Sequence, residues 1–243
     1  MTRPRRYSVK CIRGSDRGYV AFHAPRYRLI LDLLHQHGVT PRSKVLDIGP
    51  SRLTWLIREE FGVAVDSLGF GEDQAHDAGK HFQFDLNLAL NREQWRRDLP
   101  AYDFVLMAEV LEHLYTAPEL VLAYVRTLVA DNGLLILQTP NAASLPKRLK
   151  LLLGRNPYEM IRLEPADPGH YREYTIAELK RLVTGAGFRT ERLMTAYWFD
   201  ARFAHHETGQ ADPRPILGVL KNVVYRMLPM PLREGITIIC RST

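Results

Sequence analysis

The chain has 243 residues and a formal net charge of +6, and 46% of its residues are hydrophobic against 25% that are charged. These values are typical of a folded globular protein, so they exclude wholesale disorder, and the length suits one doubly wound core with a small cap. The apolar runs are far too short to span a bilayer, and no apolar stretch follows the basic N-terminus as it would in a signal peptide. The two cysteines, Cys11 and Cys240, lie far apart and indicate a reducing compartment, so we expect a cytoplasmic protein.

Basic residues gather in two parts of the sequence. A solvated surface is the simplest explanation for both clusters. The alternative is attraction to an anionic partner, such as a phosphate-bearing acceptor, a membrane surface or a nucleic acid. The first cluster is Arg3, Arg5, Arg6, Lys10, Arg13 and Arg17, and the second is Lys147, Arg148, Lys150 and Arg155.

In chain order, the first predicted elements are an irregular basic arm over residues 1–24 and a helix that Pro25 opens and that ends near His37. Gly38 is suited to end that helix. Strands and helices then alternate. The predicted elements are strand 44–48, helix 52–61, strand 63–65 followed by Asp66, strand 81–86, strand 102–108, helix 109–130, strand 134–140, helix 175–186, strand 188–196 and strand 235–241.

This alternation predicts parallel strands joined by right-handed crossovers, with helices on both faces of the sheet. The fold class is therefore α/β, a doubly wound, mostly parallel seven-stranded sheet in one domain over residues 25–243, with an antiparallel strand at its edge. The long segments 141–174 and 197–234 are expected to act as lids. The second lid contains apolar residues at helical spacing, which we expect to pack on the core, with a membrane-surface role as the alternative. These residues are Ile216, Leu217, Leu220, Val223, Val224 and Met227.

The stretch KVLDIGPSRLTWLI at 44–57 predicts a buried strand, a Gly-Pro turn and an apolar helix. A dinucleotide site needs three glycines in this turn, because the backbone must approach the pyrophosphate closely. Here Gly49 stands alone, Ser51 and Leu53 occupy the positions of further glycines, and Pro50 has no N–H to donate. The turn suits a ligand that presents an amino acid and a nucleoside without phosphate, such as S-adenosylmethionine, and disfavours an NAD-dependent oxidoreductase.

From about residue 25 to residue 243 the chain resembles the class I S-adenosylmethionine-dependent methyltransferases of the ubiquinone-biosynthesis type, known as methyltransferase types 11 and 23. VLDIGPSRL at 45–53 is similar to their first motif, and YDFVLMAEVLEHL at 102–114 is similar to their fourth-strand motif. LLILQTPN at 134–141 and HYREYTIAELKRLVTGAGF at 170–188 match later segments in the family's order. The resemblance implies a Rossmann-like fold and methyl transfer from S-adenosylmethionine.

The resemblance also implies which residues contact the cofactor. Asp47 and Gly49 hold its methionine end. Ser51 departs from the family motif, and its side chain is expected to cap the next helix and keep the helix N-terminus directed at the ligand carboxylate. Asp66 accepts both ribose hydroxyls and Asp85 bonds the adenine amino group, although both aspartates are also ordinary turn residues. The full set of expected cofactor contacts is Asp47, Gly49, Ser51, Asp66, Asp85, Ala108, Glu109 and Val110.

Glu109, Glu112 and His113 are spaced to share one face of the predicted helix 109–130. Oxygen ligands with one imidazole suit Mg²⁺ or Mn²⁺. The pattern E-x-x-E-H resembles that of metal-dependent ubiquinone O-methyltransferases and small-RNA 2′-O-methyltransferases. In the RNA enzymes a second histidine completes the site, and His170 has a comparable place here.

Two alternatives to a metal remain open at these positions. The carboxylates are also favourable near a helix N-terminus, without any ion. In that case His113 or His170 is the candidate catalytic residue as general base, because an imidazole titrates near the working pH. Alignment of the acceptor with the methyl group can also suffice without either histidine.

We expect methyl transfer to a hydroxyl, ahead of an amine or a carbon, of a small-molecule or glycan acceptor in polysaccharide or natural-product biosynthesis. The basic lid favours an anionic acceptor. One alternative is a metal-dependent RNA 2′-O-methyltransferase, although the basic residues lack the interleaved aromatics of a single-strand binder. The other is a non-catalytic scaffold that kept the fold and lost the glycines of the first motif.

Overall fold

The computed structural model describes residues 17–70, 79–164, 168–201 and 215–243, so the predicted basic arm lies outside the described residues up to position 16. The chain divides into two compact units. The first comprises residues 1–39 and Tyr197–Leu228, and the second comprises Thr40–Ala196 and Pro229–Thr243. The second unit contains the whole sheet.

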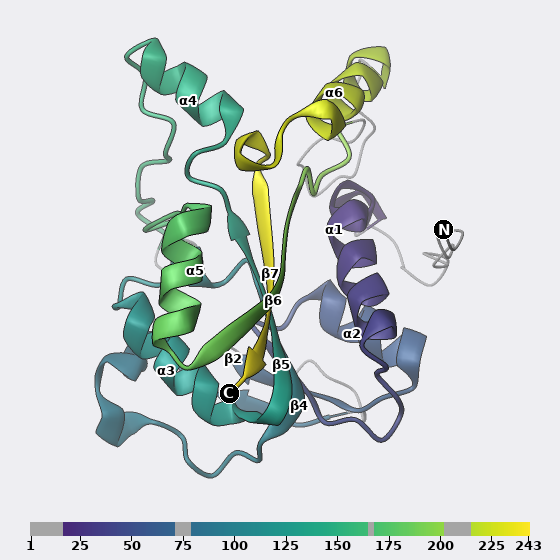
Figure 1. The fold of residues 1–243 in the computed structure, drawn as a ribbon, viewed down its shortest axis with the longest axis vertical. Coiled ribbons are helices and arrows are strands. Elements are labelled where there is room, and N and C mark those ends of the chain that lie inside the picture. Colours follow the sequence, from purple (N-terminus) through teal and green to yellow (C-terminus); the bar gives the residue numbers. More distant parts are fainter. Residues whose placement is uncertain (1–16, 71–78, 165–167, 202–214) are drawn as a thin grey trace. The chain divides into compact units, whose positions relative to one another are not determined.

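The sheet has seven strands in the order β3-β2-β1-β4-β5-β7-β6 (Figure 1). Strands β1 to β5 pair in parallel, and β7 runs antiparallel to both β5 and β6. This confirms the predicted fold class, a doubly wound and mostly parallel sheet. The predicted antiparallel edge strand differs in one detail, because the antiparallel strand is β7, which lies second from the edge, with β6 outermost. The strands are β1 (Val45–Ile48), β2 (Val65–Gly69), β3 (His81–Gln83), β4 (Tyr102–Ala108), β5 (Val129–Pro140), β6 (Phe188–Ala196) and β7 (Gly235–Ser242).

The helices of the second unit cover both faces of this sheet. Figure 1 shows α3 (Pro118–Leu128) and α5 (Ile176–Gly185) on one side and α2 (Arg52–Phe61) on the other. A cluster of buried hydrophobic residues joins α3 and α5 to the central strands, with Tyr124 and Leu179 among its members. Because the central strands are buried on both faces, their sequences are nearly continuous apolar runs.

The predicted helix over 109–130 is wrong in its first part. Glu109 has a φ of 59°, and the chain then makes only a short 3-10 turn, η5 (Leu111–His113). Helix α3 begins at Pro118, whose fixed φ suits a first helical turn. Residues 109–117 therefore form a loop at the carboxyl end of β4, which places their side chains differently from those of a helix.

Other boundaries also differ from the prediction. Helix α1 runs from Arg17 to Gln36 and contains Pro25, so Pro25 does not open it. Strand β2 starts where the predicted strand 63–65 ends, and Asp66 therefore lies near the beginning of β2. By contrast, α5 and β6 lie within a residue of their predicted bounds, because a capping box at Thr175 fixes the start of α5.

Both predicted lid segments contain a helix, α4 (Leu145–Leu152) in the first and α6 (Pro215–Met227) in the second. The expectation that α6 packs its apolar residues on the core is wrong, because they are exposed to solvent. Within the described residues, none of the helices has the length and apolar character that crossing a membrane requires. The exposed residues of α6 that were expected to be buried are Ile216, Leu217, Leu220, Val223, Val224 and Met227.

Candidate functional site

The carboxyl ends of β1 and β4 form the point at which the chain switches direction in the sheet, the usual ligand position in open α/β folds. Each strand is followed directly by a residue with a left-handed backbone, Gly49 with a φ of 74° and Glu109 with a φ of 59°. A Cβ added at Gly49 would come within 2.5 Å of the Val110 side chain, so the two strand ends are in close contact. A non-glycine residue in this conformation is uncommon and is found preferentially at functional sites.

The turn after β1 enters α2 through a capping box. Ser51 Oγ accepts from the Leu53 amide at 3.2 Å, and the Ser51 amide donates to Thr54 Oγ1 at 3.0 Å. The predicted helix cap at Ser51 is therefore confirmed. Thr54 Oγ1 in turn donates to the buried Asp47 carboxylate at 2.5 Å, which ties the helix to β1. Because Pro50 has no N–H and these amides are bound internally, the turn has few donors left for a pyrophosphate.

Asp66 lies away from this edge of the sheet. In the parallel pairing it stands opposite Leu46, two residues before β1 ends at Ile48. Its carboxylate accepts from the Lys80 amide at 2.7 Å and from the Tyr102 hydroxyl at 2.9 Å. Since each strand residue advances about 3.3 Å, this position is too far from the carboxyl edge to support the predicted ribose contact.

Asp85, Ala108 and Val110 lie beyond or at the carboxyl ends of their strands. Asp85 caps the 3-10 turn after β3, and its carboxylate accepts from both the backbone and the side-chain amide of Asn87, at 2.8 and 3.0 Å. Ala108 ends β4, and Val110 precedes η5. Their placement is compatible with the predicted adenosine contacts, which stay predictions, as does the predicted contact of Asp47 with the methionine end.

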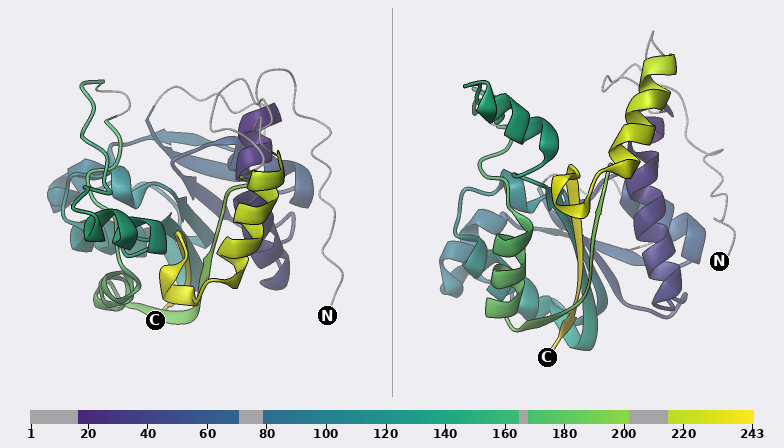
Figure 2. Two further views of the ribbon diagram at one scale, coloured as in Figure 1. Left: turned by 90° about the horizontal axis from the view of Figure 1, so that it is seen from above. Right: turned by 45° about the horizontal axis from the view of Figure 1, so that its top comes forward.

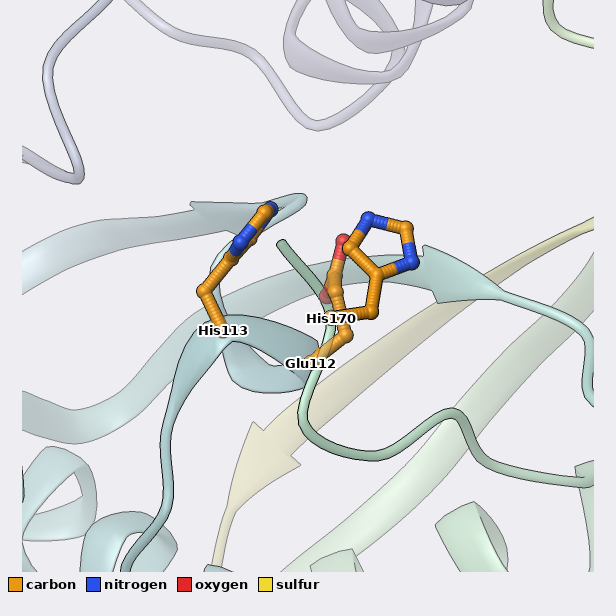
Figure 3. A group of neighbouring side chains, drawn as sticks. All are labelled: Glu112, His113 and His170. Atoms are coloured by element: carbon orange, nitrogen blue, oxygen red, sulfur yellow. The ribbon is translucent and has the colours of Figure 1, made fainter. Parts of the chain in front are cut away.

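Three of the four predicted metal ligands come together beside the switch point. Among the described residues, the carboxylate or imidazole atoms of Glu112, His113 and His170 lie within 4.8 Å of one another. In Figure 3 the carboxylate of Glu112 lies between the two imidazole rings. Glu109 is not part of this group, because its left-handed backbone breaks the helix on which the predicted spacing depended.

Main-chain hydrogen bonds bring His170 to this place from a distant part of the sequence. The amides of Tyr171 and Arg172 donate to the carbonyl of Glu112 at 2.8 and 3.2 Å. The carbonyl of Tyr174 accepts from the Ala142 amide at 3.0 Å. The segment around His170 is thus held against both η5 and the end of β5.

Hydrogen bonds at Nδ1 orient both imidazole rings. His113 Nδ1 lies 2.9 Å from the carbonyl oxygen of Gly169, and His170 Nδ1 lies 3.2 Å from a carboxylate oxygen of Glu173. Both oxygens can only accept, so each Nδ1 carries a proton, and Nε2 presents a lone pair when the ring is neutral. Glu173 also forms an ion pair with Lys147 of α4. Metal-bound histidines in proteins are oriented in this way.

Burial affects the side chains of this cluster, most clearly the pKa of His170. Glu112 is fully buried, and its carboxylate accepts from the Thr139 hydroxyl at 3.0 Å. Burial, followed by the proximity of His113, lowers the pKa of His170 to about 4. His170 is therefore neutral at neutral pH, which is the state in which an imidazole binds a metal ion.

Two tyrosine rings lie next to the group in the chain. Tyr115 follows His113 by two residues and Tyr171 directly follows His170. Their ring centroids are 5.6 Å apart at an interplanar angle of 74°, and both side chains are exposed. Such exposed ring faces can pack against a flat acceptor.

Sequence reasoning missed the residues that orient the ligands. Thr139 was seen only as part of a strand, and Gly169 acts through its carbonyl, which no side-chain pattern reveals. Glu173 carried one usable signal, because it follows His170 by three residues and ends in a carboxylate that can reach back to the ring. These three residues belong to two segments that only the fold brings to the same place.

Comparison with known proteins gives a consistent assignment. A family model described as a methyltransferase domain matches residues 22–193, which is more than half of the chain. No curated protein matches the chain significantly.

Solved structures with this fold include several methyltransferases. An S-adenosylmethionine-dependent methyltransferase from Archaeoglobus fulgidus is 19% identical, with a TM-score of 0.53, and the match covers 89% of this chain and 94% of the other. The magnesium protoporphyrin IX methyltransferase of Synechocystis PCC 6803, solved with S-adenosylhomocysteine, is 13% identical, with a TM-score of 0.55 and coverage of 98% and 91%. An S-adenosylmethionine-dependent methyltransferase from Methanosarcina mazei is 13% identical, with a TM-score of 0.53 and coverage of 86% and 96%. At these identities the likeness establishes the fold.

Proposed function

Because this chain belongs to the class I S-adenosylmethionine-dependent methyltransferases, we propose that it transfers the methyl group to a hydroxyl oxygen of its acceptor. The observation that carries this proposal is the group formed by Glu112, His113 and His170 beside the end of β4. A hydroxyl is a poor nucleophile until its proton is removed, whereas a free amine needs no such help. A cluster of one buried carboxylate and two half-buried imidazoles therefore suits an oxygen acceptor.

We place the cofactor over the carboxyl ends of β1 and β4. The left-handed turn at Gly49 and the cap at Ser51 support this position on one side, and the left-handed Glu109 supports it on the other. Asp85 is the candidate for the adenine end. Asp66 is left out because its carboxylate is engaged lower in the sheet.

The donor set of the cluster fits a divalent transition metal. One carboxylate and two imidazoles differ from the set expected with Glu109, and the second imidazole shifts the preference from Mg²⁺ towards Mn²⁺ or a later metal. The hydrogen bonds that the two rings donate through Nδ1 to Gly169 and Glu173 support metal binding, since they leave Nε2 of each ring directed away from those partners. When bound there, such an ion would lower the pKa of an acceptor hydroxyl.

Residues of the chain orient the acceptor in this proposal. The carboxylate of Glu112, which accepts from the Thr139 hydroxyl, lies at the base of the site, and His113 and His170 flank it. Tyr115 and Tyr171 adjoin the ligands in the chain, and their exposed rings can receive an aromatic or sugar ring. We therefore propose a small-molecule or glycan acceptor with a ring that bears the hydroxyl.

Two binding measurements test the proposal separately. Calorimetry with S-adenosylhomocysteine tests the cofactor site, and Mn²⁺ titration followed by electron paramagnetic resonance tests the cluster. We expect His170→Ala to abolish Mn²⁺ binding and to leave S-adenosylhomocysteine binding unchanged. Mn²⁺ binding that survives in His170→Ala would contradict the metal assignment.

Acceptor class is tested with S-adenosylmethionine that carries a labelled methyl group. Phenols, catechols, glycans and RNA are offered in parallel, and the bond formed is identified by its stability to acid and base. We expect ether-linked label on a ring-bearing small molecule or glycan. Label found on RNA alone, or on nitrogen, would contradict the proposed acceptor.

A further inference from the structure

Helix α6 directs polar and aromatic side chains towards the rest of its unit and aliphatic side chains towards solvent. A helix that packs on a hydrophobic core does the opposite. Inside the first unit, Asn222 donates to the Asp200 carboxylate at 2.9 Å and accepts from the Ala201 amide at 3.0 Å. The ring of Tyr225 stacks on that of Tyr197 with centroids 4.3 Å apart. The aliphatic side chains face solvent instead, up to 83% exposed. They are Ile216, Leu217, Val219, Leu220, Val223, Val224 and Met227.

The charged residues of the sequence segment that contains α6 are of one sign. Between residues 213 and 233 the sequence contains lysine and arginine but no aspartate or glutamate. Lys221 and Arg226 of α6 are both exposed. An exposed apolar helix face of this size is rare on a soluble monomer and marks a surface that binds something.

Helix α4 of the second unit also combines exposed aliphatic side chains with basic residues and no acidic ones. Leu149, Leu152 and Leu153 are at least half exposed, and the sequence from 143 to 158 again lacks acidic residues. Figures 1 and 2 show α4 beyond the carboxyl end of the sheet of its own unit. Its one half-buried cation, Lys147, pairs with Glu173, and its other cations stay on the surface.

We propose that α4 and α6 bind the surface of an anionic lipid bilayer. A bilayer offers both things these helices need, acyl chains for the exposed aliphatic side chains and headgroup phosphates for the lysines and arginines. A second copy of this chain fits less well, because pairing either helix with its own copy would bring cations together without a facing acid. Both helices lie on the bilayer surface, since neither is long enough to cross it.

Vesicle flotation with the full chain tests this proposal. The probes are vesicles of phosphatidylcholine alone and vesicles with about a quarter of phosphatidylglycerol, at low and high salt. We expect flotation with the anionic vesicles only, and a steep loss as salt rises. Light scattering of the lipid-free protein measures the oligomeric state, which separates bilayer binding from self-association.

Variants assign the binding to the two helices. We expect Leu220→Glu with Val224→Glu in α6 to lower the vesicle affinity by about tenfold or more. In the vesicle-bound protein two negative charges would then replace aliphatic groups that enter the bilayer. Leu149→Glu with Leu152→Glu tests α4 in the same way. The matched control is Leu90→Glu, an exposed leucine outside both helices, which keeps full binding. S-adenosylhomocysteine binding by each variant shows that it is folded.

A milder pair of changes keeps the test decisive if a glutamate variant does not fold. Lys221→Gln and Arg226→Gln leave the apolar face intact, and each lowers affinity for anionic vesicles by about fivefold. Absence of flotation with anionic vesicles overturns the proposal, as does equal flotation with both kinds of vesicle. A dimer that the α6 variant dissociates, without vesicle binding in the wild type, assigns the helix to self-association and also overturns it.

Discussion

The turn after β1 and the loop after β4 meet at the switch point of the sheet, yet they are stabilised in different ways. The turn is held by its near neighbours, because Ser51 and Thr54 cap the helix and Thr54 reaches back to Asp47. The loop is held by distant segments, because His113 is bonded to Gly169. The turn after β1, which we call the local half of the site, fixes the cofactor side through near neighbours. The loop after β4, the assembled half, forms the acceptor side through distant segments. The acceptor side can therefore vary while the cofactor geometry stays fixed.

The largest effect is expected where the two halves touch. Gly49→Ala combines a left-handed backbone with a Cβ 2.5 Å from Val110, so we expect the free energy of unfolding to fall by about 3 kcal/mol. Urea denaturation measures this loss. The matched control is Gly38→Ala, whose φ is 75° with open space around the new Cβ, and it should lose only about 1 kcal/mol. Equal losses in the two variants would show that the contact with Val110 is unimportant.

A change at Glu173 breaks the assembled half alone. Glu173→Gln weakens the bond that orients His170, so we expect Mn²⁺ affinity to fall by about ten- to a hundredfold while S-adenosylhomocysteine binding stays the same. Metal titration and calorimetry measure the two affinities. Asp98→Asn, which removes an exposed carboxylate paired with Arg96, is the matched control and should change neither. Unaltered Mn²⁺ binding in Glu173→Gln would remove the evidence that Glu173 supports the site.

A change at Ser51 loosens the local half. We expect Ser51→Ala to lower the free energy of unfolding by about 1 kcal/mol and S-adenosylhomocysteine affinity by about threefold, since the helix start is less well fixed. Thr175→Ala removes the same kind of cap from α5, far along the chain from the turn. It should cost similar stability and leave ligand affinity unchanged. A parallel fall in affinity in both variants would mean that Ser51 acts only through global stability.

The smallest effect on binding is expected at Asp66. Asp66→Asn weakens the contacts with Lys80 and Tyr102, so we expect roughly 1 kcal/mol less stability. Affinity for S-adenosylhomocysteine should stay within about twofold, because the carboxylate lies below the ligand edge of the sheet. A loss of about tenfold or more would restore Asp66 as a ribose contact.

The elements that could be predicted from the sequence are those whose determinants are local. Strand β1, the cap at Ser51 and the Thr175 start of α5 follow from apolar runs and short-range side-chain bonds. The loop after β4 could not be predicted, because apolar residues at helical spacing continue through it and nothing local reveals the left-handed Glu109. The predicted position of Asp66 at the end of a strand is wrong for a related reason. The apolar run before it does not show where strand pairing begins.

For the candidate site, the sequence was enough to name the candidate ligands, but their arrangement depends on the fold. His170 was identified by its resemblance to a known pattern, whereas its bond to Glu173 depends on how the segment after α4 returns to η5. The outward face of α6 was unpredictable, because the spacing of its apolar residues gives one side of a helix without saying what that side meets.

The position of β7 has a consequence for how the molecule is made. β7 is translated after β6 and yet stands between β6 and β5, so β6 cannot join the sheet until β7 has left the ribosome. Until then the apolar β5 remains an open edge that can pair with another nascent chain. A polypeptide truncated before Gly235 would therefore expose this edge of β5 and be prone to aggregate.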